Sequence, residues 1–219
     1  MTTRRMPLTR DAIVDAAIYL LDQSGSDRMT MRNLGRELGV DATACYRHFR
    51  DKPDLMRAVG DRLLSGVTSD LPPEADWRAT VLIVCQRLRA ALLRQPRLAV
   101  AMRDAPPLAA GEFAITESLL AQFLRAGLDA RHAALAYHSV IELTVGSATI
   151  DASVDASVDA LDDVGRQRMY DGWRQTYATL PIDEFPASHA VALELYRGTA
   201  DGRFAVALEQ LLDGIAARG

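Results

Sequence analysis

The 219-residue sequence has only two cysteines and no long apolar run. Cys45 and Cys85 lie far apart and outside any CxxC or histidine-rich context, which argues against a disulfide framework and a zinc site. No stretch approaches the roughly 18 uninterrupted apolar residues of a membrane span. The start MTTRRMPLTR lacks the apolar segment of a signal peptide. We therefore expect reduced thiols, no membrane partner and a cytoplasmic location.

The sequence also lacks the motifs of common enzyme classes. It has no nucleophile elbow, no HExxH and no phosphate-binding glycine loop. Its only histidines are His48, His132, His138 and His189. These absences argue against an enzyme, so we expect no catalytic residue, no metal and no cofactor.

Hydrophobic residues make up 49% of the chain, enough to bury one or two cores. They recur at spacings of three and four, and no run alternates polar with apolar residues, so we predict an all-α fold. Residues 1–67 hold eleven basic and nine acidic side chains, and the remainder holds fourteen basic and twenty acidic ones. This modest asymmetry is only weak support for a nucleic-acid partner.

The helix signals divide the chain near residue 67. Capping residues Thr9, Thr30 and Asp41, with Gly25 and Gly39 as terminators, predict three helices, and a fourth runs from Pro53 towards Ser69. We assign 1–67 to a helix-turn-helix domain and 68–219 to a larger helical domain. In the second domain the breakers delimit helices at about 76–95, 97–104, 111–126, 129–150, 163–179, 187–197 and 201–217. The Asp-Ser repeat at 151–159 is expected to be an exposed loop or a frayed helix extension.

Residues 29–49 fit a helix, a glycine turn and a second helix. Leu34, Leu38, Val40 and Phe49 are expected to form the small core that fixes the two helices. The second, at about 41–49, then becomes a recognition helix, because it combines donors for phosphates and base edges with an apolar anchor. Arginine can bond guanine bidentately and a threonine methyl can contact thymine. The side chains assigned to DNA are Thr30, Arg32, Thr43, Tyr46, Arg47, His48 and Lys52.

Alternatives remain for several of these residues. Tyr46 and Phe49 are also consistent with plain core aromatics, and Arg47 and Lys52 with solvated surface charges. The N-terminal arginines, Arg4, Arg5 and Arg10, are either a basic arm that reaches a neighbouring groove or a terminus without contacts.

Residues 8–55 resemble the DNA-binding domain of the TetR family of bacterial regulators. The match rests on Thr9, Ile13, Ala16-Ala17, Gly25, Thr30, Arg32, Leu34, Leu38-Gly39-Val40, Tyr46-Arg47-His48-Phe49, Lys52 and Leu55. The resemblance implies that the seven side chains assigned to DNA occupy the family's contact positions. Gly35 stands where the family usually has alanine and Cys45 where it usually has leucine. Each departure is expected to cost local stability.

The C-terminal part resembles the tetracycline-repressor-type ligand-binding domain, on segments such as Asp76-Trp77-Arg78, Leu92-Leu93-Arg94-Gln95-Pro96 and Leu211-Leu212-Asp213-Gly214-Ile215. The resemblance implies a small-molecule effector, whose identity stays open, and a homodimer. Candidate ligand residues, each with an ordinary core or surface role as its alternative, are Met102, Phe113, Leu120, Phe123, Tyr137, His138, Ile141, Glu142, Trp173 and Tyr177. Candidate dimer residues are Ala134, Ile141, Val145, Phe204, Leu208, Leu211 and Leu212.

The resulting hypothesis is a regulator, usually a repressor by resemblance, that a small molecule releases from a palindromic double-stranded operator. A constitutive DNA-binding or protein-interaction module is the alternative. For the aspartates at 151, 155 and 159, a solvated acidic face is favoured over a metal site. For Cys45, a redox switch is disfavoured, because no second cysteine lies nearby in sequence.

Overall fold

The computed structural model describes residues 8–73, 75–96, 108–157 and 163–217. These residues form helices and no strand, which confirms the all-α prediction. The helices are α1 (Arg10–Arg28), α2 (Met31–Glu37), α3 (Ala42–Tyr46), α4 (Lys52–Leu64), α5 (Trp77–Arg94), α7 (Ala110–Arg125), α8 (Ala130–Ser157), α9 (Asp163–Ala178), α10 (Pro186–Val191) and α11 (Ala200–Ala216). The helix expected at 97–104 lies outside the described residues.

The first three helices begin at the caps that the sequence predicts. The Thr9 hydroxyl accepts from the amide of Ala12, the Thr30 hydroxyl from Asn33, and the Asp41 carboxylate from Thr43, at 2.8–3.1 Å. Each bond satisfies an amide that the first helical turn leaves without a partner.

Two helix ends differ from the prediction. α1 continues through Gly25 to Arg28, because a glycine ends a helix only where its backbone turns left-handed, as Gly39 does at φ +62°. α3 ends at Tyr46 and not near 49, because the amides of Arg47 and His48 bond three residues back and tighten the last turn.

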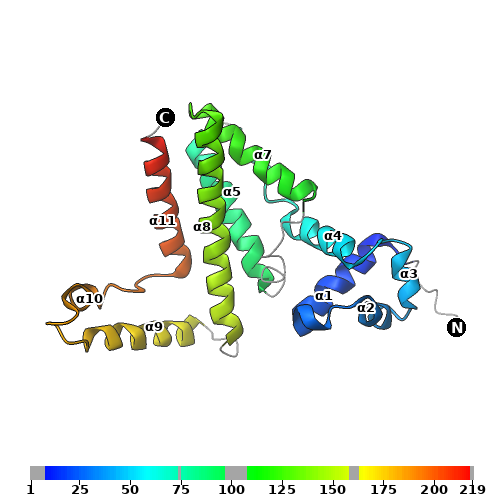
Figure 1. Cartoon of the computed structure of the whole chain (residues 1–219), viewed down its shortest axis with the longest axis horizontal. Helices are drawn as coiled ribbons and strands as arrows, with labels where there is room; N and C mark the ends of the chain where they lie inside the picture. Colours follow the sequence, from blue (N-terminus) through cyan, green and yellow to red (C-terminus); the bar gives the residue numbers. More distant parts are fainter. Residues whose placement is uncertain (1–7, 74, 97–107, 158–162, 218–219) are drawn as a thin grey trace.

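The C-terminal domain is built around α8, the long helix beside α5 in Figure 1, with α7 crossing the pair and α11 alongside. α8 extends beyond the predicted 150 into the Asp-Ser repeat and ends at Ser157. α10 ends at Val191, short of the predicted 197, and α9 and α10 project away from the bundle. No helix formed by the described residues is long and apolar enough to cross a membrane.

α4 joins the N-terminal helices to the bundle (Figure 1). On one side its Arg62 pairs with Asp11 at 2.6 Å and Asp15 at 2.8 Å on α1. On the other side Asp61 accepts a hydrogen bond of 2.7 Å from the amide of Gly111 at the start of α7. The predicted boundary near 67 falls in the linker between α4 and α5.

Candidate nucleic-acid interface and effector region

The turn between α2 and α3 depends on a close backbone approach at Gly35. A Cβ atom there would lie 2.9 Å from the carbonyl oxygen of Val40 and 3.0 Å from the amide of Ala42. The amide of Val40 also donates to the Gly35 carbonyl at 2.8 Å. The expectation that Gly35 simply costs stability is therefore wrong: its missing side chain lets the two helices of the motif pack closely.

α3 turns one face into the core and the other to solvent. Cys45 and Phe49 are fully buried, while Thr43, Tyr46 and Arg47 are exposed. Tyr46 exposes half of its surface, so the alternative of a core aromatic applies to Phe49 and not to Tyr46. The exposed side chains are the donors that groove reading requires, and the buried ones fix the helix that carries them.

Thr43 and Asp41 form a linked pair at the start of α3. The Thr43 hydroxyl donates to the Asp41 carboxylate at 2.7 Å, and the Thr43 amide donates to it at 2.8 Å. These two hydrogen bonds hold the pKa of Asp41 below its usual range. The hydroxyl is thereby turned towards the cap.

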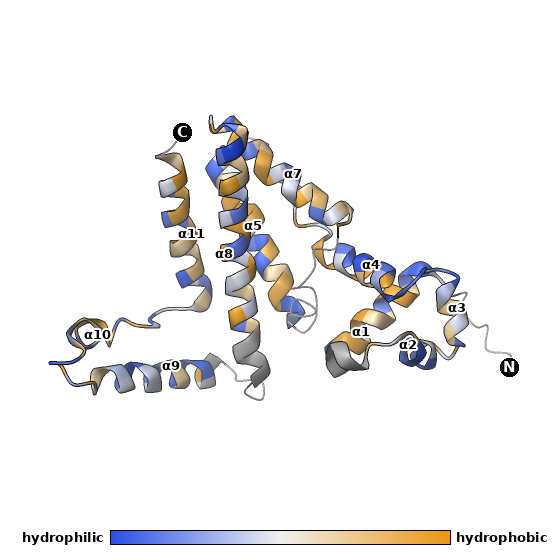
Figure 2. Cartoon of the chain, in the orientation of Figure 1, coloured by the Kyte–Doolittle hydropathy of each residue, from blue (hydrophilic) through white to orange (hydrophobic). Residues whose placement is uncertain are grey.

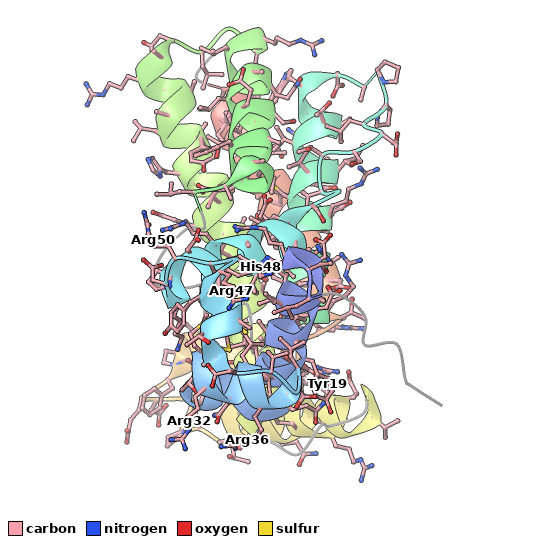
Figure 3. The ribbon with its side chains drawn as sticks, turned by 90° about the vertical axis from the view of Figure 1, so that its right-hand side faces the viewer. Tyr19, Arg32, Arg36, Arg47, His48 and Arg50 are labelled. Carbon is pink, nitrogen blue, oxygen red and sulfur yellow. The ribbon has the colours of Figure 1, made fainter. Side chains whose placement is uncertain are left out.

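Arg32 and Lys52, predicted as phosphate contacts, are exposed on α2 and at the start of α4, and Thr30 is exposed at the cap of α2. The sequence reasoning missed Arg36 and Arg50, which are exposed as well. Figure 3 places Arg47 and His48 near the centre of this end of the molecule, Arg32 and Arg36 at one edge and Arg50 at the other. The four-residue spacing of the α2 arginines was the signal available for Arg36.

Arg10 is part of the folded domain and not of a free arm. It donates to the carbonyl oxygen of His48 at 2.6 Å, and its guanidinium lies 4.0 Å from the centre of the Phe49 ring. It therefore holds the end of the recognition helix against α1. Arg4 and Arg5 lie outside the described residues.

Figure 2 shows α2, beside this surface, as largely hydrophilic.

Both thiols are buried within the chain. Burial raises the pKa of the Cys45 thiol, with a smaller contribution from the charge of Asp41. Burial raises the pKa of Cys85 to about 11. Protonated, inaccessible thiols are poor redox sensors, which is consistent with the disfavoured switch at Cys45.

The structure brings only part of the predicted ligand set together. Phe123 is fully buried and packs 6.3 Å from the Trp77 ring, whereas Phe113 exposes 56% of its surface. Tyr137 shares a hydrogen bond of 2.9 Å with Thr116. The other candidates on α7 and α8 are half-buried (Leu120, Ile141) or exposed (His138, Glu142).

The two ligand candidates on α9 lie in the projecting part of the chain. The Trp173 ring packs against Tyr170 and Tyr196, and Tyr177 is half-buried. One cavity, of about 490 Å³, nevertheless joins part of the two sets, because Glu142 on α8 and Trp173 on α9 both line it. The α7 candidates do not line this cavity. Met102 lies outside the described residues.

The predicted dimer residues fall into two groups. Phe204, Leu208 and Leu212 are buried in the chain's own core, so they support α11 from within and do not face a partner here. The remaining ones, on α8 and α11, are half-buried or exposed: Ala134, Ile141, Val145 and Leu211. Exposed apolar side chains that the prediction missed flank them, namely Leu135, Ile150 and Val206.

A buried charge cluster was also missed. Arg89 on α5 pairs with Asp151 on α8 and Asp201 on α11, and it donates to the Ser147 hydroxyl at 3.1 Å. The favoured assignment of Asp151 to a solvated acidic face is therefore wrong. Its partners on the predicted ladder, Asp155 and Asp159, have side chains outside the described residues. No group of three or more His, Cys, Asp or Glu in the described ranges is arranged to hold a metal ion.

Two short helices joined by a glycine turn present an exposed basic face, and they are attached to a larger helical bundle. This arrangement defines a helix-turn-helix protein with a separate C-terminal domain. Residues 13–59 match the family model described as "Bacterial regulatory proteins, tetR family", and residues 70–218 match "Tetracyclin repressor-like, C-terminal domain". The chain belongs to the TetR family.

Individual relatives agree with this assignment. An HTH-type transcriptional regulator of Saccharopolyspora erythraea is 28% identical over 145 residues, which cover 66% of this chain and 61% of that protein. Tetracycline repressor protein class A from transposon 1721, from Escherichia coli, is 30% identical over 148 residues, covering 64% and 65%. The chain thus aligns with less than two thirds of the length of these two curated relatives.

Solved structures extend the similarity over nearly the whole chain. The Streptomyces coelicolor TetR family protein ActR, in complex with (S)-DNPA, superposes with a TM-score of 0.82 at 26% identity. That match covers 97% of this chain and 99% of the other. The arrangement of the two domains is therefore shared with a protein of known structure.

Proposed function

We propose that this protein is a ligand-responsive transcriptional regulator, which binds a palindromic DNA operator as a homodimer and is released from it by a small molecule. The observation that carries the DNA-binding part is the exposed face of α3. Tyr46 and Arg47 project from a short helix that Cys45 and Phe49 anchor in the core. A helix fixed in this way, with basic residues on both flanks, has the chemistry of a major-groove reader.

The homodimer is supported by the exposed apolar surface of α8 and α11. Leu135 exposes 53% of its surface, Ile150 66% and Val206 54%. A groove of about 270 Å³ runs between the two helices and is lined by Leu135, Ser139 and Leu211 among others. Two recognition helices are needed about one duplex turn apart, roughly 34–36 Å, to read successive half-sites. A dimer through this surface supplies the second one.

The effector part is supported by what relatives bind. ActR of S. coelicolor has been solved with (S)-DNPA and with actinorhodin, and another relative is named as a tetracycline repressor. No cofactor is invoked. If the effector releases DNA, the affinity for the operator and the affinity for the effector must be reciprocally coupled. The physical connection available for that coupling is α4, through Asp61 and Arg62.

The DNA-binding proposal is tested by selecting duplexes from a random library with the purified protein. We expect an inverted repeat whose half-site centres are about one helical turn apart. Lys52 is the only lysine in the chain, so its acetylation, followed by mass spectrometry, is a single-site footprint. The selected duplex should protect Lys52, and a scrambled duplex at the same salt concentration should protect it less. Failure to enrich any sequence, together with full acetylation of Lys52, would contradict the proposal.

A further inference from the structure

Arg89 lies between two cavities of the C-terminal domain. Its side chain is only 4% exposed, and within the described ranges it is the one charged residue that is buried. The first cavity, of about 470 Å³, is lined by Leu93, Arg166, Tyr170 and Asp201 as well as Arg89. The second, of about 460 Å³, again includes Arg89 and Asp201. The contact between these two residues therefore separates two spaces of the size that small molecules occupy.

The two carboxylates that bind Arg89 differ in their surroundings. Asp151 exposes 17% of its side chain, whereas Asp201 exposes 82%. Asp151 therefore belongs to the interior, together with the Ser147 hydroxyl that accepts from the Arg89 Nε. Asp201, in the first turn of α11, reaches Arg89 from the solvent side. A carboxylate that is already hydrated loses little when it returns to water, so this ion pair is the easier one to open.

We infer that the first cavity binds an organic carboxylate with a flat aromatic body, and that its carboxylate displaces Asp201 from Arg89. The inference deepens the proposed function, because this occupant would be the effector. A guanidinium presents five N–H donors in a planar fork that matches carboxylate geometry. Asp201 occupies donors of that fork in the present structure and marks where a ligand carboxylate would lie.

The charges around the cavity favour an anion. Arg89 and Arg166 both line the cavity, so two guanidinium groups border the space that an occupant would fill. A buried arginine must keep its partners, since removing one leaves a charge without compensation. Displacement by another carboxylate satisfies this requirement, and displacement by a neutral or cationic group does not.

The wall of the cavity suits an aromatic body. Tyr170 is nearly buried and is held by a parallel stack with Tyr196 at 5.5 Å and an edge contact with Trp173 at 5.5 Å. The guanidinium of Arg203 also lies 4.8 Å from the centre of this ring. This packing fixes Tyr170, so a ligand meets an ordered ring at the cavity wall. Leu93 on α5 adds an apolar contact. Release of Asp201 would loosen the start of α11, the helix whose outer side belongs to the proposed dimer surface.

The test uses isothermal titration calorimetry with 2-naphthoate and, as its neutral isostere, 2-naphthamide. We expect the parent protein to bind naphthoate and not naphthamide. Asp201→Asn removes the competing carboxylate and should bind naphthoate about fivefold more tightly. The exposed Asp183 does not line the cavity, so Asp183→Asn should behave like the parent protein. Arg89→Gln should lose naphthoate binding, with circular dichroism to confirm its fold.

Equal binding of naphthoate and naphthamide, or no naphthoate binding by Asp201→Asn, would overturn the inference. The result for Asp201→Asn can be interpreted even if Arg89→Gln fails to fold. The same samples are assayed for binding to the selected duplex. Absence of DNA binding by the parent protein would contradict the proposed function, while the calorimetric result for the cavity would still stand. If naphthoate binds tightly but does not change the affinity for DNA, the binding site is supported and its regulatory role is contradicted.

Discussion

Asp61 on α4 caps α7 through the amide of Gly111, at 2.7 Å. The residue before α7, Ala109, offers no side-chain cap of its own. A carboxylate from the neighbouring domain therefore caps this helix. The next residue on α4, Arg62, binds α1. Adjacent residues of one helix thus connect the C-terminal bundle with the DNA-binding domain.

Asp61→Ala should lower the free energy of unfolding by ~1 kcal/mol, the usual cost of a lost cap. It should also speed hydrogen exchange of the Gly111 amide, because its acceptor is removed. Urea unfolding and hydrogen exchange measured by mass spectrometry give the two values. Glu117→Ala, which removes an exposed carboxylate on the same helix α7, is the control. Unchanged exchange at residues 109–113 would show that the cap is not maintained in solution.

Gly35→Ala should destabilise the protein although alanine is the better helix former. The new methyl group would meet backbone atoms at 2.9–3.2 Å, and the turn before α3 must move to accommodate it. Gly172→Ala is the matched control, because a Cβ there meets nothing within 4 Å. The control should gain roughly 0.5–1 kcal/mol from helix propensity. A rise in the melting temperature of Gly35→Ala as large as that of the control would refute the close approach.

The raised thiol pKa values predict both reactivity and pH dependence. At pH 8 both thiols are protonated and buried, so Ellman's reagent should react with neither until the protein is unfolded, and then with two thiols per chain. For Cys85 the folded pKa of about 11 exceeds the ordinary 9.0. The unfolded thiol therefore ionises first, and stability should fall as pH rises from 9 to 11. Cys85→Ala should reduce that alkaline loss; rapid labelling of the native protein would contradict the assignment.

Leu135→Glu should disrupt the proposed dimer. Leu135 is 53% exposed on α8 and borders the groove shared with α11, so a charge there would be buried against the partner. Leu124→Glu is a close control, since Leu124 is also 53% exposed but lies on α7. Light scattering should give a monomeric mass for the first variant and a dimeric mass for the second. A dimeric mass for both would move the interface elsewhere.

Local features were predictable from the sequence and distant ones were not. The caps Thr30 and Asp41 and the buried Phe49 follow from patterns within one short segment. The partners of Arg89 lie 62 and 112 residues away, and no pattern in one sequence specifies such pairings. One signal was present: Arg89 stands at the spacing of the apolar stripe of α5, between Cys85 and Leu92. A charge on a buried face calls for a partner or a ligand.

Most of the predicted ligand residues do not share a cavity, for a related reason. Periodicity does not distinguish Phe113, exposed on α7, from Phe123, buried on the same helix. It also gives no indication that Trp173 lies on a helix that projects from the bundle (Figure 1). Which side of a helix meets a cavity is decided by the packing of helices far apart in sequence.

The central claim is that α3 reads DNA, and the salt dependence of two variants tests it most directly. The measurement is fluorescence anisotropy with selected and scrambled duplexes across a salt series, with Arg168→Ala on the distant α9 as the control. Arg47→Ala should weaken binding to the selected duplex and relax discrimination by ~1–3 kcal/mol if the side chain reaches a base. Lys52→Ala should weaken both duplexes alike and reduce the salt slope by about one unit for each phosphate that the protein no longer neutralises. If both variants bind the selected duplex as tightly as the parent protein does, α3 is not the recognition helix and the account fails.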